Sequence, residues 1–449
     1  MKNIITLTTK LLTYVTNFGQ NSKNTPNRDL APTPIRDIKK PFDSAQGKPA
    51  ADSFKCPYCR SLNFVKKGFR QKKHEKVQMY LCNDCQKTFT QQITKGKHYP
   101  LAIIFRALSL HNLGYSLNSI SSELKIGKFG TTPSSITNWI QEYSEYMPYL
   151  RMRPYAIKKF KPKDMVITQN LNHKQVYQYR YHRAKCQLII EDDFKHRRFG
   201  SVQEFLELIP SDCPHHHFTD EKSMRASESP LTFSKTQMIV RAKQNYANKI
   251  CKFVLQSVKN RRRRHEALQN FMLCNDSVTV ATEVPIFIER EDLEHLQTQL
   301  GFEFYTKENK VRNQNIGKGS EPPTPVTFLN SPLPRIITGH IDFLQIRNGQ
   351  VHILDYKPKA EKVKPIEQLT LYAMALSRLT GLRLFEFKCA WFDENDYFEF
   401  YPLHVLHKPK SKRRRRKVYT MEGIYKINQA SEKIENLRPS TKGPSITIN

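Results

Sequence analysis

The chain has 449 residues, with 73 Lys and Arg against 41 Asp and Glu, and a formal net charge of +32. This length is sufficient for about three domains and excludes a small module held together by disulfides. Such an excess of positive charge favours a polyanionic partner, most commonly a nucleic acid. No run approaches 18 apolar residues and no signal-peptide pattern opens the chain, so we expect neither membrane insertion nor secretion.

Changes in composition along the chain predict a multidomain protein. In chain order, we expect a disordered N-terminus or linker at 1–53, a cysteine-bounded unit at 54–95, a helical unit at 96–150, a basic middle region at 151–232, an α/β unit at 233–407 with a loop-rich insertion near 301–335, and a basic disordered tail at 408–449. Within the middle region, residues 175–190 are predicted to be a strand that faces the polyanion. Residues 233–273 have the pattern of a long helix, interrupted only by a run of four arginines.

Four cysteines occur as two CxxC pairs, Cys56 with Cys59 and Cys82 with Cys85. Four thiolates form the closed tetrahedral site of structural Zn²⁺, and the residues between the pairs indicate two strands, so we predict a zinc ribbon. The spacing between the pairs slightly exceeds the usual one. A rubredoxin-like iron site and four unrelated thiols are the alternatives. The total of nine Cys is odd, which excludes complete pairing within the chain.

Two further helices are predicted after the cysteines. Ser116 is placed to cap a helix that carries Ile120 and Leu124, glycines 127 and 130 turn the chain, and Thr132-Pro133 opens a second helix. On that second helix, Ile136, Trp139 and Ile140 are expected to face inward. The polar positions left for the major groove of DNA are Ser134, Ser135, Thr137 and Asn138. This arrangement indicates a helix-turn-helix, and a plain helical hairpin is the alternative.

Residues 54–145 resemble the N-terminal half of insertion-sequence transposases, in which a ribbon of the form CPxC…G…R…YxCxxCxxxF precedes a helix-turn-helix. The matching residues are Cys56, Pro57, Cys59, Gly68, Arg70, Tyr80, Cys82, Cys85 and Phe89. The resemblance implies DNA binding and an origin in a mobile element. A DDE catalytic domain follows in those transposases. Here the acids of the middle region, Asp164, Asp192, Asp193 and Glu221, form no pattern that can be aligned with it.

Residues near position 215 offer a different set of metal-binding side chains. Cys213 and His215 to His217 could be a second metal site, but no partner pair lies at ligand spacing along the chain. We therefore interpret this segment as a loop. The two four-arginine runs are interpreted as solvated clusters that attract phosphates rather than as readers of base sequence.

The C-terminal unit carries the strongest catalytic pattern. Two predicted strands meet at Asn348-Gly349, a dipeptide suited to a two-residue hairpin turn, which places Asp342 and Asp355 on neighbouring strands. Lys357 is two residues beyond Asp355 and projects from the same face. Two carboxylates and a neighbouring backbone carbonyl suit Mg²⁺ or Mn²⁺, and a lysine can orient water or offset phosphoryl charge. This combination indicates phosphodiester hydrolysis.

A predicted helix completes that pattern. It begins near Pro365, ends at Gly381 and carries Gln368 and Tyr372 on one face. The motifs GxxD, DYK and QxxxY resemble those of the PD-(D/E)XK nuclease superfamily, most closely its RecB-like branch. The resemblance implies a restriction-endonuclease-like core, a mixed sheet flanked by helices.

The resemblance also implies roles for individual residues. Asp342, Asp355 and the Tyr356 carbonyl would hold the metal, Lys357 would activate water, and Gln368 and Tyr372 would steady DNA or the lysine. The RecB-like branch has an upstream helical histidine as a metal ligand, for which His265 is the candidate. Glu266 and Glu283 are the alternatives for this third group.

Together these patterns predict a metal-dependent DNA endonuclease of a mobile element, with structural Zn²⁺ and catalytic Mg²⁺ or Mn²⁺. DNA is the expected partner, with homodimer formation left open. The expected location is with the chromosome, in the cytoplasm of a prokaryote or the nucleus of a eukaryote. A non-catalytic DNA-binding regulator and a DDE transposase are the competing hypotheses, which the products formed in Mg²⁺ would separate.

Overall fold

The computed structural model describes part of the chain. The described residues are 55–71, 76–90, 99–124, 130–192, 194–233, 239–242, 245–258, 260–306, 335–406, 417–420 and 423–426. Contacts divide the chain into Met1–Cys56 and Pro57–Asn449. The expected linker at 1–53 and residues 307–334 of the insertion lie outside the described residues, as do both Gly127 and the arginine run at 413–416.

The tail differs in one place from the expected disorder. Residues Lys417–Thr420 (β15) and Gly423–Lys426 (β16) form an antiparallel pair. The two strands contain Val418, Tyr419, Ile424 and Tyr425, which are residue types that favour strands. The remainder of 408–449 lies outside the described residues.

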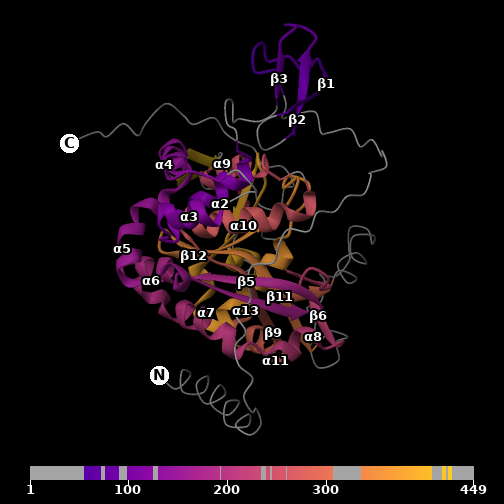
Figure 1. Cartoon of the computed structure of the whole chain (residues 1–449). Helices are drawn as coiled ribbons and strands as arrows, with labels where there is room; N and C mark the ends of the chain where they lie inside the picture. Colours follow the sequence, from indigo (N-terminus) through magenta and orange to yellow (C-terminus); the bar gives the residue numbers. More distant parts are fainter. Residues whose placement is uncertain are drawn as a thin grey trace, which may run out of the picture. The chain divides into compact units, whose positions relative to one another are not determined.

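The cysteine-bounded unit is a three-stranded antiparallel sheet (Figure 1). Its strands are β1 (Phe64–Gln71), β2 (Lys76–Cys82) and β3 (Thr88–Thr90). Phe64, Tyr80 and Phe89 pack together on it, with ring centroids 5.6 to 5.8 Å apart. Two strands were expected between the cysteine pairs, and both are present. The third follows the second pair because Lys87 O accepts a hydrogen bond from Cys82 N and returns the chain to β2.

The helical unit consists of α2 (Leu101–Asn112), α3 (Leu117–Glu123) and α4 (Pro133–Glu142). The expected capping is confirmed: the Ser116 side chain accepts a hydrogen bond from Ser119 N, and the Thr132 side chain accepts one from Ser135 N. Ile136 and Trp139 are buried, whereas Ile140 is only half-buried. A DNA-binding role for these helices stays a prediction.

Residues 233–273 are not one long helix. The strand β8 (Ile239–Ala242) comes first, then α9 (Tyr246–Leu255), and α10 (Arg264–Asn275) begins after a 3₁₀ turn at Arg261–Arg263. The Asn245 side chain caps α9 in a capping box, and the Asn260 side chain accepts a hydrogen bond from Arg262 N. Two helix starts within 20 residues therefore divide the segment, because each cap favours a new helix rather than continuation.

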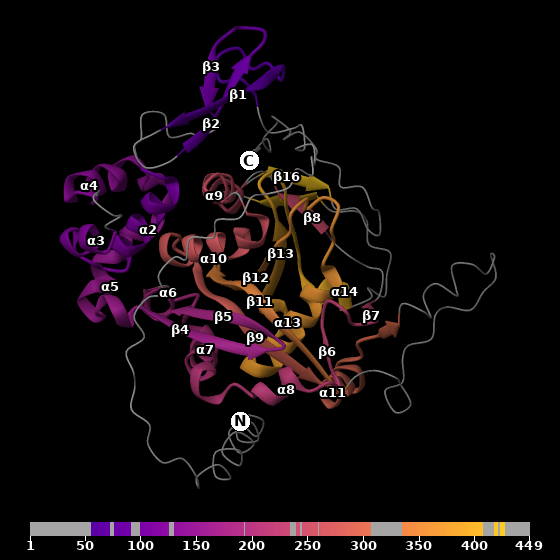
Figure 2. The same cartoon turned by 45° about the vertical axis from the view of Figure 1, so that its right-hand side comes forward.

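The largest element is a nine-stranded mixed sheet, which Figure 2 shows with its strands side by side. In spatial order it contains β4 (Val166–His173), β5 (Gln175–His182), β9 (Thr279–Glu289), β11 (Ile336–Arg347), β12 (Gln350–Tyr356), β13 (Phe387–Phe392), β14 (Tyr397–Phe400) and β8. The ninth strand, β6 (Ser223–Arg225), pairs with β11 in parallel. The pair β12 and β13 is also parallel, joined by the crossover helix α13 (Ile366–Thr380).

The boundary expected at residue 232 does not divide the fold. Strands β4 and β5 belong to the basic middle region, yet β5 pairs with β9 through Arg180 and Tyr181. The side chains of Leu171, Tyr179 and Tyr181 are fully buried in the core of this sheet. Residues 175–190 are also not one strand, because α6 (Arg183–Asp192) begins directly after β5. The many basic residues of this region made its alternation of buried and exposed side chains hard to recognise in the sequence.

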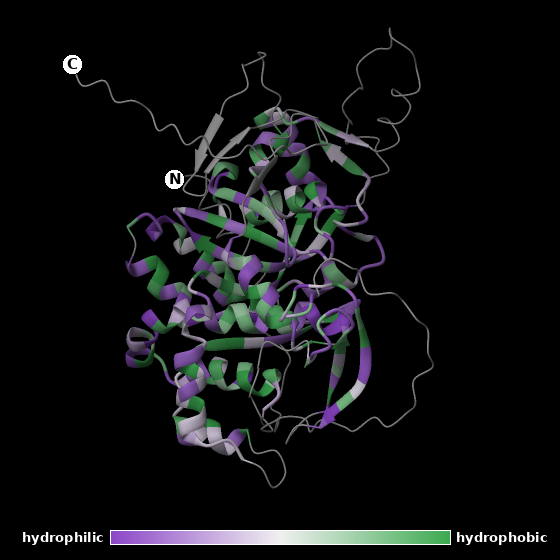
Figure 3. Ribbon diagram, turned by 90° about the horizontal axis from the view of Figure 1, so that it is seen from above, coloured by the Kyte–Doolittle hydropathy of each residue, from purple (hydrophilic) through white to green (hydrophobic). Residues whose placement is uncertain are grey.

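The two faces of the sheet bury different helices. Ile353 of β12 lies in one apolar cluster with Leu369 of α13, whereas Leu354 lies in another with Phe271 of α10. Hydrophobic residues are concentrated in the strands and the helices that pack on them (Figure 3). The remaining elements are α5 (Arg153–Lys159), α7 (Gly200–Asp212), α8 (His215–Thr219), β7 (Leu231–Phe233), α11 (Arg290–Leu300), β10 (Phe304–Thr306) and α14 (Pro402–Leu406). Within the described residues, no helix is both long and apolar enough to cross a membrane.

Candidate nuclease site

The hairpin of β11 and β12 brings the two predicted aspartates together. Asn348 and Gly349 have φ angles of 53° and 69°, the left-handed pair that a two-residue turn requires. The register that pairs Phe343 with Leu354 places Asp342 and Asp355 next to each other on the two strands. Tyr356 N donates a hydrogen bond to Asp342 Oδ2 at 3.3 Å, which holds the carboxylate against β12.

Lys357 lies beside these acids, just beyond the end of β12. Its Nζ atom is 2.8 Å from Asp355 Oδ2, in an ion pair whose carboxylate is 4% exposed. The backbone N–H of Lys357 donates to Phe392 O on β13, so the residue is fixed by the neighbouring parallel strand. The spacing of Asp355 and Lys357 in the sequence predicted this contact.

Strand β11 is irregular at Asp342. Ile341 and Leu344, three residues apart, both lie in the apolar cluster shared with α13, whereas Phe343 lies in the cluster shared with α10. A regular strand alternates every two residues, so the alternation is interrupted between 341 and 344. On β9 the facing residue is Glu283, whose φ of 51° is left-handed. At this point of β11 the Asp342 carboxylate contacts both Tyr356 N and His265 of α10.

Helix α10 contributes a histidine to the same place. His265 Nδ1 lies 3.2 Å from Asp342 Oδ2. One turn later on α10, Gln269 Nε2 donates to Glu283 Oε1 at 2.7 Å and so fixes this half-buried carboxyl group. Two glutamates were the alternatives to His265 as the third metal ligand. Glu283 lies at the site, whereas Glu266, which follows His265 on α10, is exposed.

Helix α13 closes the other side. Gln368 Nε2 donates to the Tyr372 hydroxyl at 2.8 Å, as expected for two residues one turn apart. The Tyr372 ring packs on the backbone of β11 at Gly339, where an added Cβ would lie 2.3 Å from Tyr372 Cε1. Gly339 is therefore required for the close approach of α13 to β11.

These residues fall in a segment that matches a family model. Residues 240–441 match the model of the PD-(D/E)XK nuclease superfamily. No curated protein and no solved structure matches the chain. The match includes the hairpin, α10 and α13, and begins at the strand β8. It does not reach the ribbon, so the resemblance of residues 54–145 to transposases stays a prediction.

The carboxyl groups of Asp342, Asp355 and Glu283 influence each other. Burial and the charge of Asp342 raise the pKa of Asp355 well above its usual value and that of Glu283 to about 7. Burial also acts to raise the pKa of Asp342, but the hydrogen bond and charge of His265 outweigh it and lower the pKa to about 2. Crowded carboxylates of this kind favour a bound cation, since it offsets their mutual repulsion.

A cavity of about 250 Å³ opens at this nuclease-like site. Asp342, Glu283, His265, Gln368 and Tyr372 line it together with two cationic residues. These two are Lys174, at the turn between β4 and β5, and Arg225 of β6. The acids and the cations thus share one cavity, although sequence reasoning placed the cations in a separate region. The pairing of β5 with β9 and that of β6 with β11 bring this region to the site.

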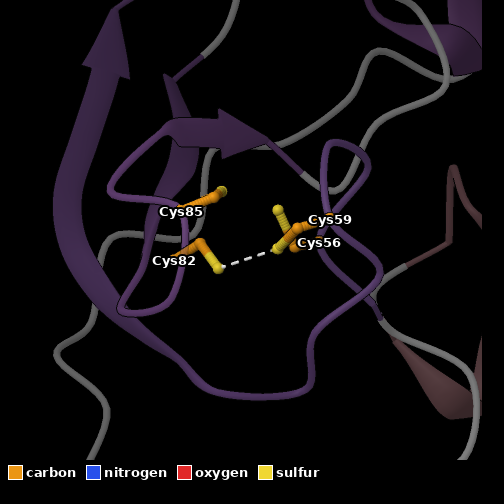
Figure 4. Close-up of side chains that lie close together, drawn as sticks. All are labelled: Cys56, Cys59, Cys82 and Cys85. Carbon is orange, nitrogen blue, oxygen red and sulfur yellow. Dashed lines mark hydrogen bonds between the residues drawn. The ribbon is translucent and has the colours of Figure 1, made fainter.

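The four predicted cysteines gather in the ribbon (Figure 4). Their ligand atoms all lie within 4.8 Å of one another, and the Sγ atoms of Cys59 and Cys82 are 3.5 Å apart. Tetrahedral geometry with Zn–S bonds of about 2.3 Å places two sulfurs roughly 3.8 Å apart, so the cluster fits zinc. Four thiolates would fill the tetrahedron and leave no open position, which suits a structural ion.

The segment with Cys213 and His215, which was expected to be a loop, carries a second group of possible metal ligands. His215 begins the short helix α8, and His173 of β4 joins Cys213 and His215, with all ligand atoms within 4.8 Å of one another. His173 is 40 residues before Cys213, and only the sheet brings them together, so ligand spacing along the chain could not reveal the group. Asp164, Asp192 and Glu221, by contrast, are exposed on separate segments.

Proposed function

We propose that the PD-(D/E)XK segment is a metal-dependent DNA endonuclease. The observation that carries the proposal is the juxtaposition of Asp342, Asp355 and Lys357 on one hairpin, with the Lys357 ammonium 2.8 Å from Asp355 Oδ2. This geometry accompanies the match of residues 240–441 to the nuclease superfamily. Two acids that can hold a metal ion, together with a lysine and a cavity lined by Lys174 and Arg225, suit a phosphodiester substrate. The metal ion would offset the charge of the scissile phosphate, and the cationic residues would offset that of the DNA backbone.

The donor set fits a hard divalent cation. Asp342, Asp355 and the Tyr356 carbonyl would hold Mg²⁺ or Mn²⁺, with His265 or Glu283 as the further ligand. The bound ion would polarise the phosphoryl oxygen and lower the pKa of a water molecule.

The protein side chains around the ion orient and stabilise the reacting groups. Lys357 offers its positive charge beside Asp355, where the attacking water and the developing phosphoryl charge would be stabilised. Gln368 Nε2 donates a hydrogen bond of 2.8 Å to the Tyr372 hydroxyl, and this pair would position α13 against β11. Lys174 and Arg225 would contact the phosphates that flank the scissile bond, because both line the same cavity.

The N-terminal units would deliver this nuclease to DNA. The ribbon would bind one structural Zn²⁺ through Cys56, Cys59, Cys82 and Cys85. Helix α4 would contact the major groove with its exposed Ser134 and Asn138. Charge of +32 on the whole chain supports strong phosphate binding. This layout suits a protein of a mobile element, with the DNA-binding units placed before the nuclease.

A cleavage assay on the full chain tests the proposal. Labelled duplex and single-stranded DNA are incubated with wild-type protein and with Asp342→Asn, in Mg²⁺, in Mn²⁺ and in EDTA. We expect hydrolysis products only with wild-type protein and a divalent metal. Binding without cleavage under every condition would instead support a DNA-binding regulator, and joined strands that do not depend on Asp342 would support a transposase.

A further inference from the structure

The group made by His173, Cys213 and His215 is well separated from the ribbon cysteines in the sequence. His173 is the last residue of β4, Cys213 follows α7, and His215 is the first residue of α8. His173 Nε2 lies 2.9 Å from His215 Nδ1 and 4.0 Å from Cys213 Sγ. Three segments therefore direct two imidazole nitrogens and one sulfur at a common point.

These distances are close to those of a transition-metal site. With Zn–N bonds of about 2.0–2.1 Å and Zn–S bonds of about 2.3 Å, tetrahedral angles place N···N at roughly 3.3 Å and N···S at roughly 3.6 Å. The observed separations of 2.9 and 4.0 Å lie on either side of those values. Shifts of about 0.4 Å, within the reach of side-chain rotation, would complete the geometry.

The partners of His173 orient its ring as the partners of a metal ligand do. The other ring nitrogen, Nδ1, lies 2.8 Å from His340 Nε2. The ring of Phe218 stacks on that of His173 with centroids 4.0 Å apart, and Tyr177 stacks on His340 at 3.6 Å. A ligating histidine usually donates its second N–H to a neighbouring acceptor, which fixes its tautomer and its orientation.

We propose that His173, Cys213 and His215 bind a transition-metal ion, with Zn²⁺ as the ion in the cell. A thiolate with two imidazoles selects a soft or borderline ion rather than Mg²⁺. His173 is buried, while Cys213 is half-buried and His215 is exposed, so the ion can enter from solvent. Three protein donors leave the fourth tetrahedral position to water.

The bound ion would also order one wall of the catalytic cavity. Coordination through His173 Nε2 requires the proton on Nδ1, which then donates to His340 Nε2. His340 lies two residues before Asp342 on β11, and both line the cavity with His173. The ion would thus fix α8 to β4 and set the tautomer of a histidine beside the proposed nuclease site.

The three adjacent histidines provide a matched control. His216 is exposed, and its ligand atoms do not belong to the group. His217 stacks on Phe287 of β9, with centroids 4.8 Å apart. His216→Ala therefore changes the same helix and the same residue type without removing a proposed ligand.

The experiment measures zinc per chain in the purified full-length protein after metal loading and removal of weakly bound ions. Cys213→Ser and His215→Ala should each lose one zinc relative to wild type, and His216→Ala should lose none. The same loss should appear in a background in which Cys56, Cys59, Cys82 and Cys85 are all replaced by serine, which removes the ribbon ligands and keeps the two sites distinguishable. Equal zinc content in wild type, Cys213→Ser and His215→Ala overturns the proposal, as does an equal loss in His216→Ala.

A spectroscopic readout separates lost ligation from lost folding. Co²⁺ is loaded into the variant in which all four ribbon cysteines are replaced by serine, and the sulfur-to-cobalt charge-transfer absorption is recorded. We expect this absorption in the starting variant and its loss when Cys213→Ser is added. When His216→Ala is added instead, the d–d bands of the bound Co²⁺ should be retained. If absorption in the variant without ribbon cysteines shows no thiolate ligation, the proposal is wrong, whatever the outcome of the nuclease assay.

Discussion

The His265 imidazole of α10 is 3.2 Å from the Asp342 carboxylate of β11, and this contact joins the helix to the irregular strand. Tyr356 packs edge-on against His265, with ring centroids 4.9 Å apart, so the imidazole is held over the hairpin. The sequence pattern gave His265 only a loose assignment, because a long segment separates it from Asp342. The fold places it at the acids.

His265→Ala should weaken Mg²⁺ binding at least about tenfold, because even a residue that only orients a metal ligand contributes about 10–100-fold in affinity. Isothermal titration of Mg²⁺ measures this. Glu266→Gln, on the exposed side of the same helix, is the control and should bind as wild type does. Equal affinities for wild type and His265→Ala would remove His265 from the site.

Gly339→Ala should destabilise the sheet and impair the site, because the added Cβ would lie 2.3 Å from the Tyr372 ring. Overpacking of this kind costs about 1–3 kcal/mol. Denaturant unfolding and cleavage rate both test the effect. Gly200→Ala is the control, since no atom lies within 4 Å of the Cβ it would add. Unchanged stability in Gly339→Ala would show that α13 does not need its close approach.

His352 should make the protein less stable in acid. Burial, with the charges of Arg347 and Lys388, holds the pKa of this histidine well below its usual value. Below pH about 6.5 the unfolded chain therefore binds a proton that the folded chain does not, so the free energy of unfolding falls as the pH falls. Between pH 7.5 and 5.5 this loss amounts to about 1.4 kcal/mol.

His352→Leu tests that assignment, because leucine cannot take up a proton. The variant should lose about 1.4 kcal/mol less than wild type between pH 7.5 and 5.5. Urea unfolding at the two pH values provides the comparison. An identical loss in both proteins would mean that His352 is protonated in the folded state.

Asn138→Glu on α4 should weaken DNA binding, because it adds a carboxylate to the exposed surface proposed to face the major groove. The matched control is Ser122→Glu, an exposed position on α3 that adds the same charge. Binding to labelled duplex at several salt concentrations measures both. If the two variants weaken binding equally, the loss reflects overall charge and α4 is not the reading helix.

The sequence revealed the parts of the site that are close together along the chain. The hairpin, the pair Asp355 and Lys357 and the helix with Gln368 and Tyr372 depend on turn chemistry and on strand or helix periodicity. Glu283 was only an alternative to His265 as the third metal ligand. A residue with left-handed backbone angles inside a strand has no signature in the amino-acid sequence.

The contribution of the middle region could not be predicted. Lys174 and His173 lie at the turn between β4 and β5, and reach the site only because β5 pairs with β9. Basic residues alternate with buried tyrosines there, so composition indicated a separate phosphate-binding region rather than two strands of the central sheet. Pairing between strands distant in sequence is set by packing, which spacing and composition do not record.

Single-turnover cleavage of duplex DNA at saturating Mg²⁺, with Mg²⁺ and DNA binding measured in parallel, tests the central claim most directly. Asp355→Ala should lose cleavage because it removes a metal ligand. Lys357→Ala should retain Mg²⁺ and DNA binding while its rate falls by about 10² to 10³, the usual cost of losing one transition-state contact. Lys362→Ala, an exposed lysine on the same segment, should cut as wild type does. Wild-type rates in both Asp355→Ala and Lys357→Ala would contradict the assignment of this hairpin as the nuclease site.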